Sequence, residues 1–225
     1  MKLALFDLDH TLLPIDSADT WSHFLVRVGG LDAEAFGAQI REFAQQYREG
    51  RFDVPTYVAF QMNMLSRFDR AQLEAWREQF VAEHVEPHVL PSARALVQEH
   101  RNAGAEVALI SGTHAWVTTP IAHLLGLEHV IGYHPEMRDG QFTGGHVGVP
   151  TYREGKVHAV TAWLAARGRN WDDTETIFYS DSINDLPLLE RVGTPVVTNG
   201  DEKLRAIAAQ RGWRTLELFR LENSA

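Results

Sequence analysis

The sequence contains no cysteine, no long apolar run and no excess of positive charge. Without cysteine, disulfide bonds, thiolate-bound zinc and thiol nucleophiles are excluded. No apolar stretch approaches the roughly 20 residues that cross a bilayer, and the run after Lys2 meets a charge too early for a signal peptide. Lys and Arg total 21 against 30 Asp and Glu, and the net charge of −9 argues against a nucleic-acid-binding surface. We therefore expect a cytoplasmic protein with no nucleic-acid or membrane partner.

Four short segments rich in apolar residues are separated by stretches with helical periodicity. They are residues 2–7, 105–111, 176–181 and 195–199. Buried parallel strands joined by crossover helices have this pattern, so we predict an α/β fold with a Rossmann-like, doubly wound parallel sheet. Ligands bind at the carboxyl ends of such strands, so the polar residues that follow these segments are the first candidates for a site.

Residues 16–90 interrupt the alternation because they show only helical periodicity. Asp32 and Asp69 each precede a run of apolar residues spaced by three and four, as a helix cap precedes an amphipathic helix. The segment also holds enough aromatic residues for a small core of its own. We therefore predict an inserted all-helical cap domain over residues 16–90 and an α/β core domain formed by residues 1–15 and 91–225.

Two shorter segments have local signals of their own. Asp139-Gly140, flanked by residues that can extend, predicts a β-hairpin with a tight turn within residues 136–150. The last residues, 221–225, are polar and small, and we expect them to form a frayed tail.

Four groups of polar residues follow the strand-like segments or stand in nearby loops. They are 7-DLDHT-11, 111-SGT-113, Lys156 within EGKVHAV, and 180-SDSINDLPLL-189. In this order they resemble the motifs of the haloacid dehalogenase (HAD) superfamily of phosphohydrolases, and the match covers the core essentially end to end. The helical insert after the first motif is similar to the type-1 capped, phosphoserine-phosphatase-like branch, subfamily IB. The resemblance implies a magnesium-dependent phosphatase that acts on a small phosphate ester.

The residue types suit phosphoryl transfer, in which positioning and stabilisation of dispersed negative charge dominate catalysis. Asp7 is the candidate nucleophile and would form an aspartyl-phosphate intermediate. Asp9 would protonate the leaving alkoxide and then take a proton from water, and a close pair of acids can separate the two pKa values for these roles. Mg²⁺ prefers oxygen ligands, which Asp7 and Asp181 would supply. The resemblance adds the backbone carbonyl of Asp9 as a metal ligand and Thr11 as the residue that orders the loop at the phosphate.

The remaining motif residues are assigned to the phosphate and to the surroundings of the metal. Ser111 can donate its hydroxyl to a phosphate oxygen, and the backbone N–H of Gly112 can complete the cradle. Lys156 supplies positive charge to the phosphate and to the nucleophilic carboxylate. Asn184 fits a phosphate or substrate contact, and Asp185 fits a carboxylate that reaches the metal through a water molecule.

Other interpretations of these motifs fit less well. An EF-hand loop needs glycine and glutamate where the sequence has Leu12 and Ala18, and a P-loop needs glycine at Pro150. The histidines lack zinc-site spacing, although His10 and His114 lie inside motifs and could line a pocket. A module that binds or accepts phosphate without turnover, as receiver-like signalling domains do, belongs to a different class. Receivers lack a large helical insert and the second aspartate of the first motif.

The leaving group is expected to be selected by the insert. Asp16, Asp19 and Trp21 form an acidic and aromatic segment that suits a cationic leaving group. No arginine in the insert stands out as a partner for a substrate carboxylate, which weighs against phosphoserine. The segments FDLDHTLL-x-x-DS-x-x-x-W, EMRDG and FYSDS-x-NDLPLLE are similar to HAD-type histidinol-phosphate phosphatases. We expect L-histidinol phosphate as the preferred substrate, with phosphoserine or a broad set of small phosphate esters as alternatives.

Overall fold

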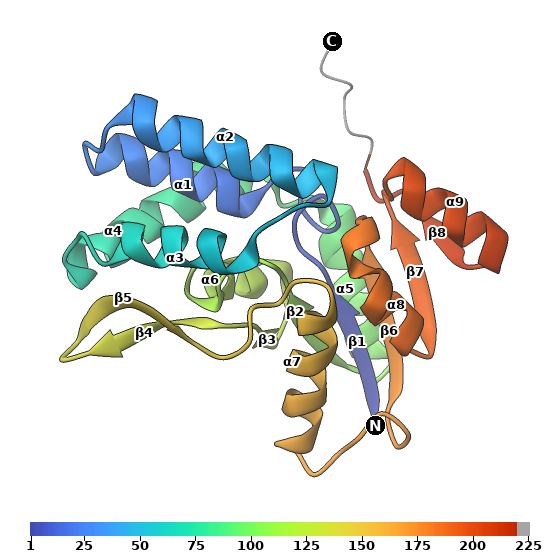
Figure 1. The fold of residues 1–225 in the computed structure, drawn as a ribbon. Helices are drawn as coiled ribbons and strands as arrows, with labels where there is room; N and C mark the ends of the chain where they lie inside the picture. The colour runs from blue at the N-terminus through green and yellow to red at the C-terminus, as the bar shows by residue number, and fades with distance from the viewer. Residues whose placement is uncertain (220–225) are drawn as a thin grey trace.

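The computed structural model describes residues 1–219, and its centre is a parallel six-stranded sheet in the order β3-β2-β1-β6-β7-β8 (Figure 1). The strands are β1 (Lys2–Phe6), β2 (Glu106–Ile110), β3 (His129–Ile131), β6 (Glu175–Ser180), β7 (Thr194–Thr198) and β8 (Arg214–Leu216). The strand order reverses at β1, which lies between β2 and β6. This is the predicted Rossmann-like arrangement, and its reversal point is where such sheets bind ligands.

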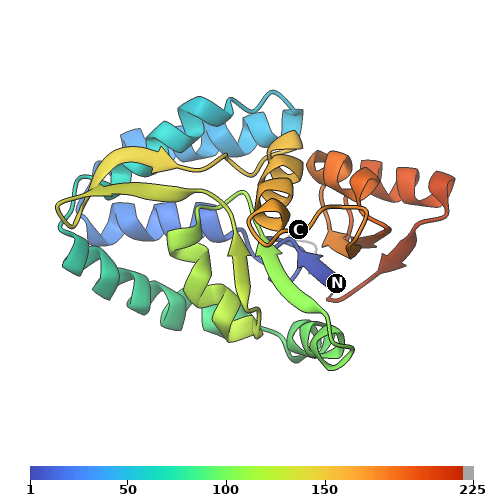
Figure 2. The same ribbon diagram turned by 90° about the horizontal axis from the view of Figure 1, so that it is seen from below.

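Helices cover both faces of the sheet because alternate residues of β1 point in opposite directions. Leu3 and Leu5 join one hydrophobic cluster with residues of α7, α8 and α9, whereas Ala4 and Phe6 join another with residues of α5 and α6. In Figure 2, α5 lies on one side of the strands and α7–α9 lie on the other. The helices are α5 (Pro91–Asn102), α6 (Ala115–Leu125), α7 (Glu154–Ala165), α8 (Leu186–Arg191) and α9 (Glu202–Arg211).

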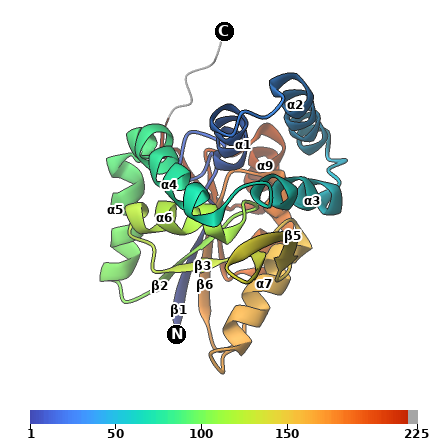
Figure 3. The same ribbon diagram turned by 90° about the vertical axis from the view of Figure 1, so that its left-hand side faces the viewer.

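Four helices and two short helical turns separate β1 from α5. Each of the four helices follows an aspartate whose carboxylate accepts a hydrogen bond from a backbone N–H of the first turn, which is a strong start signal. The caps predicted at Asp32 and Asp69 are confirmed, and the helices lie together above the sheet (Figure 3). The elements are α1 (Ser17–Val28), α2 (Ala33–Glu49), α3 (Val54–Leu65), α4 (Arg70–Phe80), a π turn (Val81–Val85) and a 3₁₀ turn (Glu86–His88).

The α1–α4 helices share their hydrophobic core with the sheet and α6. Trp21 is 1% exposed and packs on Phe24, Phe80 and Trp116, the last of which belongs to α6. Arg77 of α4 donates a hydrogen bond to the Trp116 carbonyl at 2.8 Å. One continuous cluster therefore runs from the sheet into the insert. The expectation of a separate small core was wrong, because the aromatic residues of the insert pack against α6 as well as against one another.

A two-stranded antiparallel sheet, β4 (His134–Arg138) and β5 (Gln141–Val147), forms the predicted hairpin. Its turn residues Asp139 and Gly140 have φ values of 50° and 80°. Positive φ at both central residues is the mark of a type I′ turn, which matches the twist of the flanking strands. The hairpin extends beneath α3, so the insert contacts the core at a second place (Figure 3).

The four predicted strand segments correspond to β1, β2, β6 and β7. The edge strands β3 and β8 were missed, because each has three residues and is too short to show a pattern. The domain boundaries at residues 15/16 and 90/91 stay predictions, and the tail predicted at 221–225 lies outside the described residues. Within residues 1–219, no helix is long and apolar enough to cross a membrane.

Candidate active site

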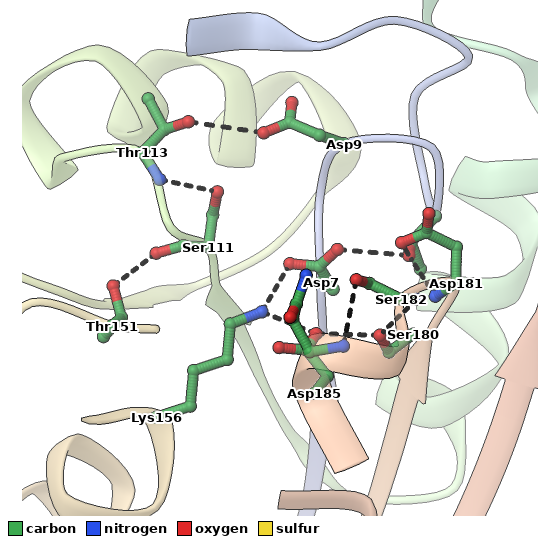
Figure 4. Close-up of polar contacts among 12 residues, drawn as sticks. Asp7, Asp9, Ser111, Thr113, Thr151, Lys156, Ser180, Asp181, Ser182 and Asp185 are labelled. Carbon is green, nitrogen blue, oxygen red and sulfur yellow. Dashed lines mark hydrogen bonds and ion pairs between the residues drawn. The ribbon is translucent and has the colours of Figure 1, made fainter. Parts of the chain in front are cut away.

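The ends of β1, β2 and β6 bring three motifs together. Phe6 pairs with Leu109 on one side and with Tyr179 on the other, so the residues that follow these strands share one edge of the sheet. Asp7 follows β1, Ser111 follows β2, and Asp181 follows β6 (Figure 4). The parallel register therefore assembles Asp7, Ser111 and Asp181, which lie far apart in the chain.

Lys156 lies between two carboxylates. Its Nζ atom donates to Asp7 Oδ1 and to Asp185 Oδ2, each at 2.7 Å, and the side chain is almost completely buried (Figure 4). Burial by itself would lower the pKa of the Lys156 amino group, but the Asp185 and Asp7 carboxylates outweigh it and raise that pKa above its ordinary value. The ammonium therefore stays charged against the carboxylate that was predicted to be the nucleophile.

The start of α7 depends on glycine to place this lysine. A Cβ atom at Gly155 would lie 2.1 Å from the carbonyl oxygen of Pro150, which no side chain can tolerate. Glycine therefore lets the backbone of residue 150 pass directly against the first turn of α7. The lysine on the next residue is thereby directed into the site.

Thr11 connects the two carboxylates that were predicted to bind metal. Its hydroxyl lies 3.2 Å from Asp7 Oδ2 and 3.1 Å from Asp181 Oδ1, and it accepts a hydrogen bond from the Asp181 backbone N–H. Burial and the charges of Asp7 and Asp185 raise the pKa of Asp181 well above its ordinary value. A bound cation would remove this penalty by compensating the clustered negative charge.

The oxygen donors at this edge fit a magnesium ion. Within residues 1–219, no group of three or more His, Cys, Asp or Glu side chains converges in a metal-binding arrangement. Mg²⁺ does not require one, because it keeps several waters and typically uses one or two carboxylates. Asp7 and Asp181, linked through Thr11, provide that pair.

Asp9 is directed away from Asp7 by its own set of partners. Its Oδ1 accepts a hydrogen bond from the Ser17 backbone N–H at 2.7 Å, and its Oδ2 lies 3.3 Å from the Thr113 hydroxyl (Figure 4). Burial, followed by the charges of Asp16 and Asp7, raises the pKa of Asp9 well above its ordinary value. The two aspartates of the first motif therefore occupy different environments.

The loop after β2 contributes backbone and hydroxyl groups to the site. Gly112 and Thr113 line the cavity beside the aspartates, whereas Ser111 lies just behind them and is 2% exposed. The Ser111 hydroxyl oxygen accepts a hydrogen bond from the Thr113 N–H at 3.1 Å, and its carbonyl accepts one from Thr151. The Ser111 hydroxyl proton is not used by the Thr113 contact and stays available for a phosphate oxygen.

Asn199 holds the loop that carries both aspartates. Its amide nitrogen donates to the carbonyls of His10 and Thr11 at 3.0 and 3.2 Å, and its amide oxygen accepts from the backbone of Leu218 and Phe219. The side chain is 7% exposed. All of its hydrogen-bonding capacity thus joins the loop after β1 to the segment after β8.

A cavity opens between this edge of the sheet and the helices α1–α3. Its core wall contains the motif acids, Lys156 and the loops after β2 and β5, while its helical wall is aromatic with a few polar groups. The helical wall consists of Asp16, Ala18, Asp19, Ser22, Ile40, Phe43, Ala44, Tyr47, Val54, Tyr57, Val58, Phe60 and Gln61, with Phe52 from the α2–α3 loop. Among the described lining residues, Lys156 is the one lysine or arginine.

The helical insert and the core also meet at the rim of this cavity. The Tyr47 hydroxyl lies 3.1 Å from the Ser182 hydroxyl across the opening. Tyr152 and Arg153 donate to the amide oxygen of Asn184 at 3.0–3.3 Å, and Arg153 also reaches the carbonyl of Gly50 in the insert. These contacts link residues of α2 and the α2–α3 loop to the loop that follows β6.

The structure brings together most of the predicted site residues. Asp7, Asp9, Lys156, Asp181 and Asp185 line one cavity, as do Gly112, Asp16 and Asp19. Trp21 does not, because α1 turns its ring into the core; this expectation was wrong. Asn184 is not among the lining residues, and its amide oxygen accepts hydrogen bonds from Tyr152 and Arg153.

The sequence allowed His10 and His114 to line a pocket. His10 lines the cavity, whereas His114 is buried behind it at the start of α6. Other cavity residues were missed. The aromatic residues of α2 and α3 and the polar pair of Ser22 and Gln61 were not identified. Helical periodicity marks an apolar face but does not distinguish a face that packs on the core from one that lines a cavity.

Comparisons with known proteins agree with this geometry. The sequence profile of the haloacid dehalogenase-like hydrolases matches residues 4–190. A histidinol-phosphatase of Neisseria meningitidis serogroup C is 40% identical over 217 residues, which cover 96% of this chain and 98% of the relative. A phosphoserine phosphatase of Mycobacterium tuberculosis is 33% identical over 231 residues, covering 99% of this chain and 72% of that protein.

A solved structure has nearly the same fold over its full length. The protein of unknown function from Bordetella pertussis Tohama I superposes with a TM-score of 0.91 at 41% sequence identity. The alignment covers 97% of this chain and 99% of that chain. The arrangement of sheet, helical insert and hairpin is therefore shared by a second protein.

Proposed function

Because this chain belongs to the haloacid dehalogenase-like hydrolases and is a phosphoric monoester hydrolase, we propose that it transfers the phosphoryl group to Asp7 with the help of Mg²⁺. The observation that carries this proposal is the buried Asp7–Lys156–Asp185 contact at the reversal point of the sheet. A buried, charged lysine stabilises an ionised Asp7 and places positive charge where phosphate oxygens would gather.

Each residue of the site has a distinct role in this mechanism. A magnesium ion held by Asp7, Asp181 and the carbonyl of Asp9 would supply charge to the phosphate when bound. The Asp7 carboxylate attacks phosphorus, forming an aspartyl phosphate, while Asp9 gives its proton to the leaving oxygen. Asp9 then takes a proton from water, which attacks phosphorus and releases Asp7 and inorganic phosphate. Lys156 and the backbone of Gly112 stabilise the equatorial oxygens in both steps.

We propose L-histidinol phosphate as the preferred substrate. The helical wall carries the carboxylates of Asp16 and Asp19 and aromatic rings, which suit an ammonium and an imidazole. Phosphoserine also carries a carboxylate, and among the described lining residues the one lysine is engaged by Asp7 and Asp185. The 40% identity to a histidinol-phosphatase supports the same substrate, whereas the 33% identity to a phosphoserine phosphatase keeps phosphoserine as the alternative.

The test compares kcat/KM for L-histidinol phosphate, phosphoserine and p-nitrophenyl phosphate with Mg²⁺ present. We expect histidinol phosphate to exceed the other two by at least tenfold, and equal values for all three would overturn the substrate assignment. Asp7→Asn should reduce turnover of every ester to background. Asp172→Asn is the matched control, because Asp172 is exposed and precedes β6, at the opposite end of that strand from Asp181. If the wild type binds phosphate or BeF₃⁻ but hydrolyses no ester, a non-turnover module is the correct description.

A further inference from the structure

Gln61 is a buried amide in the apolar face of α3. Its neighbours on that face, Val58, Met62 and Leu65, are at most 2% exposed, and Gln61 itself is 4% exposed. An amide placed among such side chains costs free energy unless its polar atoms are satisfied. Gln61 also lines the cavity, so its unused atoms can be reached from the site.

The hydrogen bonds around Ser22 determine which end of the Gln61 amide is unused. The Ser22 hydroxyl lies 2.7 Å from the carbonyl oxygen of Ala18, a distance that requires its single proton to lie between the two oxygens. Ser22 Oγ can therefore only accept from the Gln61 atom 2.9 Å away, which must be the amide nitrogen. The Gln61 carbonyl oxygen is left without a hydrogen-bond donor among residues 1–219.

The wall of the same cavity also carries carboxylates at the start of α1. Asp16 caps α1 and Asp19 lies in its first turn, Ser22 belongs to the same helix, and all three residues line the same cavity. Burial, followed by the influence of Tyr133 and of the Asp16, Asp9 and Asp19 carboxylates, raises the pKa of the Tyr57 hydroxyl well above its ordinary value. A ligand group placed here must therefore bring its own hydrogen-bond donor, and a carboxylate would meet repulsion instead.

We propose that the side-chain oxygen of Gln61 accepts a hydrogen bond from an N–H group of the leaving alcohol, which makes Gln61 a specificity-determining residue. This inference rests on the proposed function and adds the contact by which the enzyme recognises a nitrogen-bearing leaving group. The donor is an imidazole N–H or an ammonium group. Ser22 acts through Gln61, because it holds the amide nitrogen and so presents the oxygen to the cavity.

The experiment measures how Gln61 affects discrimination between matched esters. Phosphoethanolamine and n-propyl phosphate have the same chain length and differ by an ammonium in place of a methyl group. The ratio of their kcat/KM values does not depend on the fraction of enzyme that is folded. Wild type, Gln61→Met and Gln61→Glu are compared, since Met keeps the shape without the acceptor and Glu keeps an acceptor. Gln98→Met, at an exposed position of α5, is the matched control.

We expect Gln61→Met to reduce the preference for phosphoethanolamine about tenfold, because a hydrogen bond to a charged donor is lost. Gln61→Glu should keep or increase the preference, and Gln98→Met should leave it unchanged. An unchanged ratio in Gln61→Met overturns the inference. The same series with L-histidinol phosphate against p-nitrophenyl phosphate separates the two proposals. A wild type without preference for histidinol phosphate contradicts the substrate assignment, while the matched pair still decides the role of Gln61.

Discussion

Replacing Lys156 by methionine tests the electrostatics of the site most directly. The lysine is 4% exposed and donates to two carboxylates at 2.7 Å each, so its removal leaves Asp7 and Asp185 buried without a positive partner. Removing one partner of a buried ion pair typically costs about 3–5 kcal/mol. The free energy of unfolding of a whole domain is only about 5–15 kcal/mol, so Lys156→Met should remove a large part of it.

Replacing Asp185 as well should restore part of the stability that Lys156→Met loses. Asp185→Asn removes one of the two uncompensated charges and keeps an acceptor for the Ser180 hydroxyl, which lies 2.7 Å from the carboxylate. We therefore expect the Lys156→Met/Asp185→Asn double variant to be more stable than Lys156→Met alone by about 1–3 kcal/mol. Independent sites would instead show additive losses, so the sign of this difference separates charge compensation from a general packing defect.

The assay is urea denaturation at pH 7.5 in the presence of EDTA, so that no divalent cation replaces the lost charge. Lys203→Met, an exposed lysine of α9, is the matched control and should change stability by less than about 0.5 kcal/mol. The reasoning is refuted if Lys156→Met is as stable as wild type to within about 1 kcal/mol. It is also refuted if the double variant is less stable than both single variants.

Three further predictions concern the loop after β1, the rim of the cavity and the buried histidine behind it. Asn199→Asp, which loses both donors to the loop after β1, should lower kcat/KM at least tenfold for every ester alike; a loss confined to one ester would contradict a positioning role. Tyr47→Phe removes the contact with Ser182 while keeping the ring, so KM should rise a few-fold with little change in kcat, and an unaltered KM would show that the contact does not hold the cap. Burial lowers the pKa of His114 to about 3, so its protonation favours the unfolded chain and stability should fall as pH drops below about 6.5. Urea titrations at pH 7 and 5 should show a steeper loss for wild type than for His114→Gln, by up to about 1.4 kcal/mol per pH unit, and parallel curves would refute it.

The core of the site was predictable because its determinants are local. An apolar strand that ends in a polar residue places that residue at the carboxyl edge, and three such strands in a parallel sheet must share the edge. Asp7, Ser111 and Asp181 were found in this way, and Lys156 was found by its place in the motif order. The helix caps Asp32 and Asp69 were predicted for the same reason, because a helix cap depends on a few neighbouring residues.

Apart from Asp16 and Asp19, the helical wall of the cavity was not predicted, because it depends on how helices pack. Trp21 and Gln61 stand on helices of the same insert, yet the aromatic ring is buried against α6 and the amide lines the cavity. Helical periodicity does not separate these two cases, since it records only which residues share a face. The burial of each face is decided by the partner that packs on it.

By itself, the sequence determined the parallel sheet, the order of its motifs and the residues at its carboxyl edge, because strand period and strand-end chemistry are properties of short segments. Tertiary structure alone decided how Lys156 lies between Asp7 and Asp185, how Asp9 is directed away from Asp7, and which residues form the helical wall. Those features arise from contacts between segments far apart in the chain, whose geometry exists only after the sheet, the hairpin and the inserted helices have packed together.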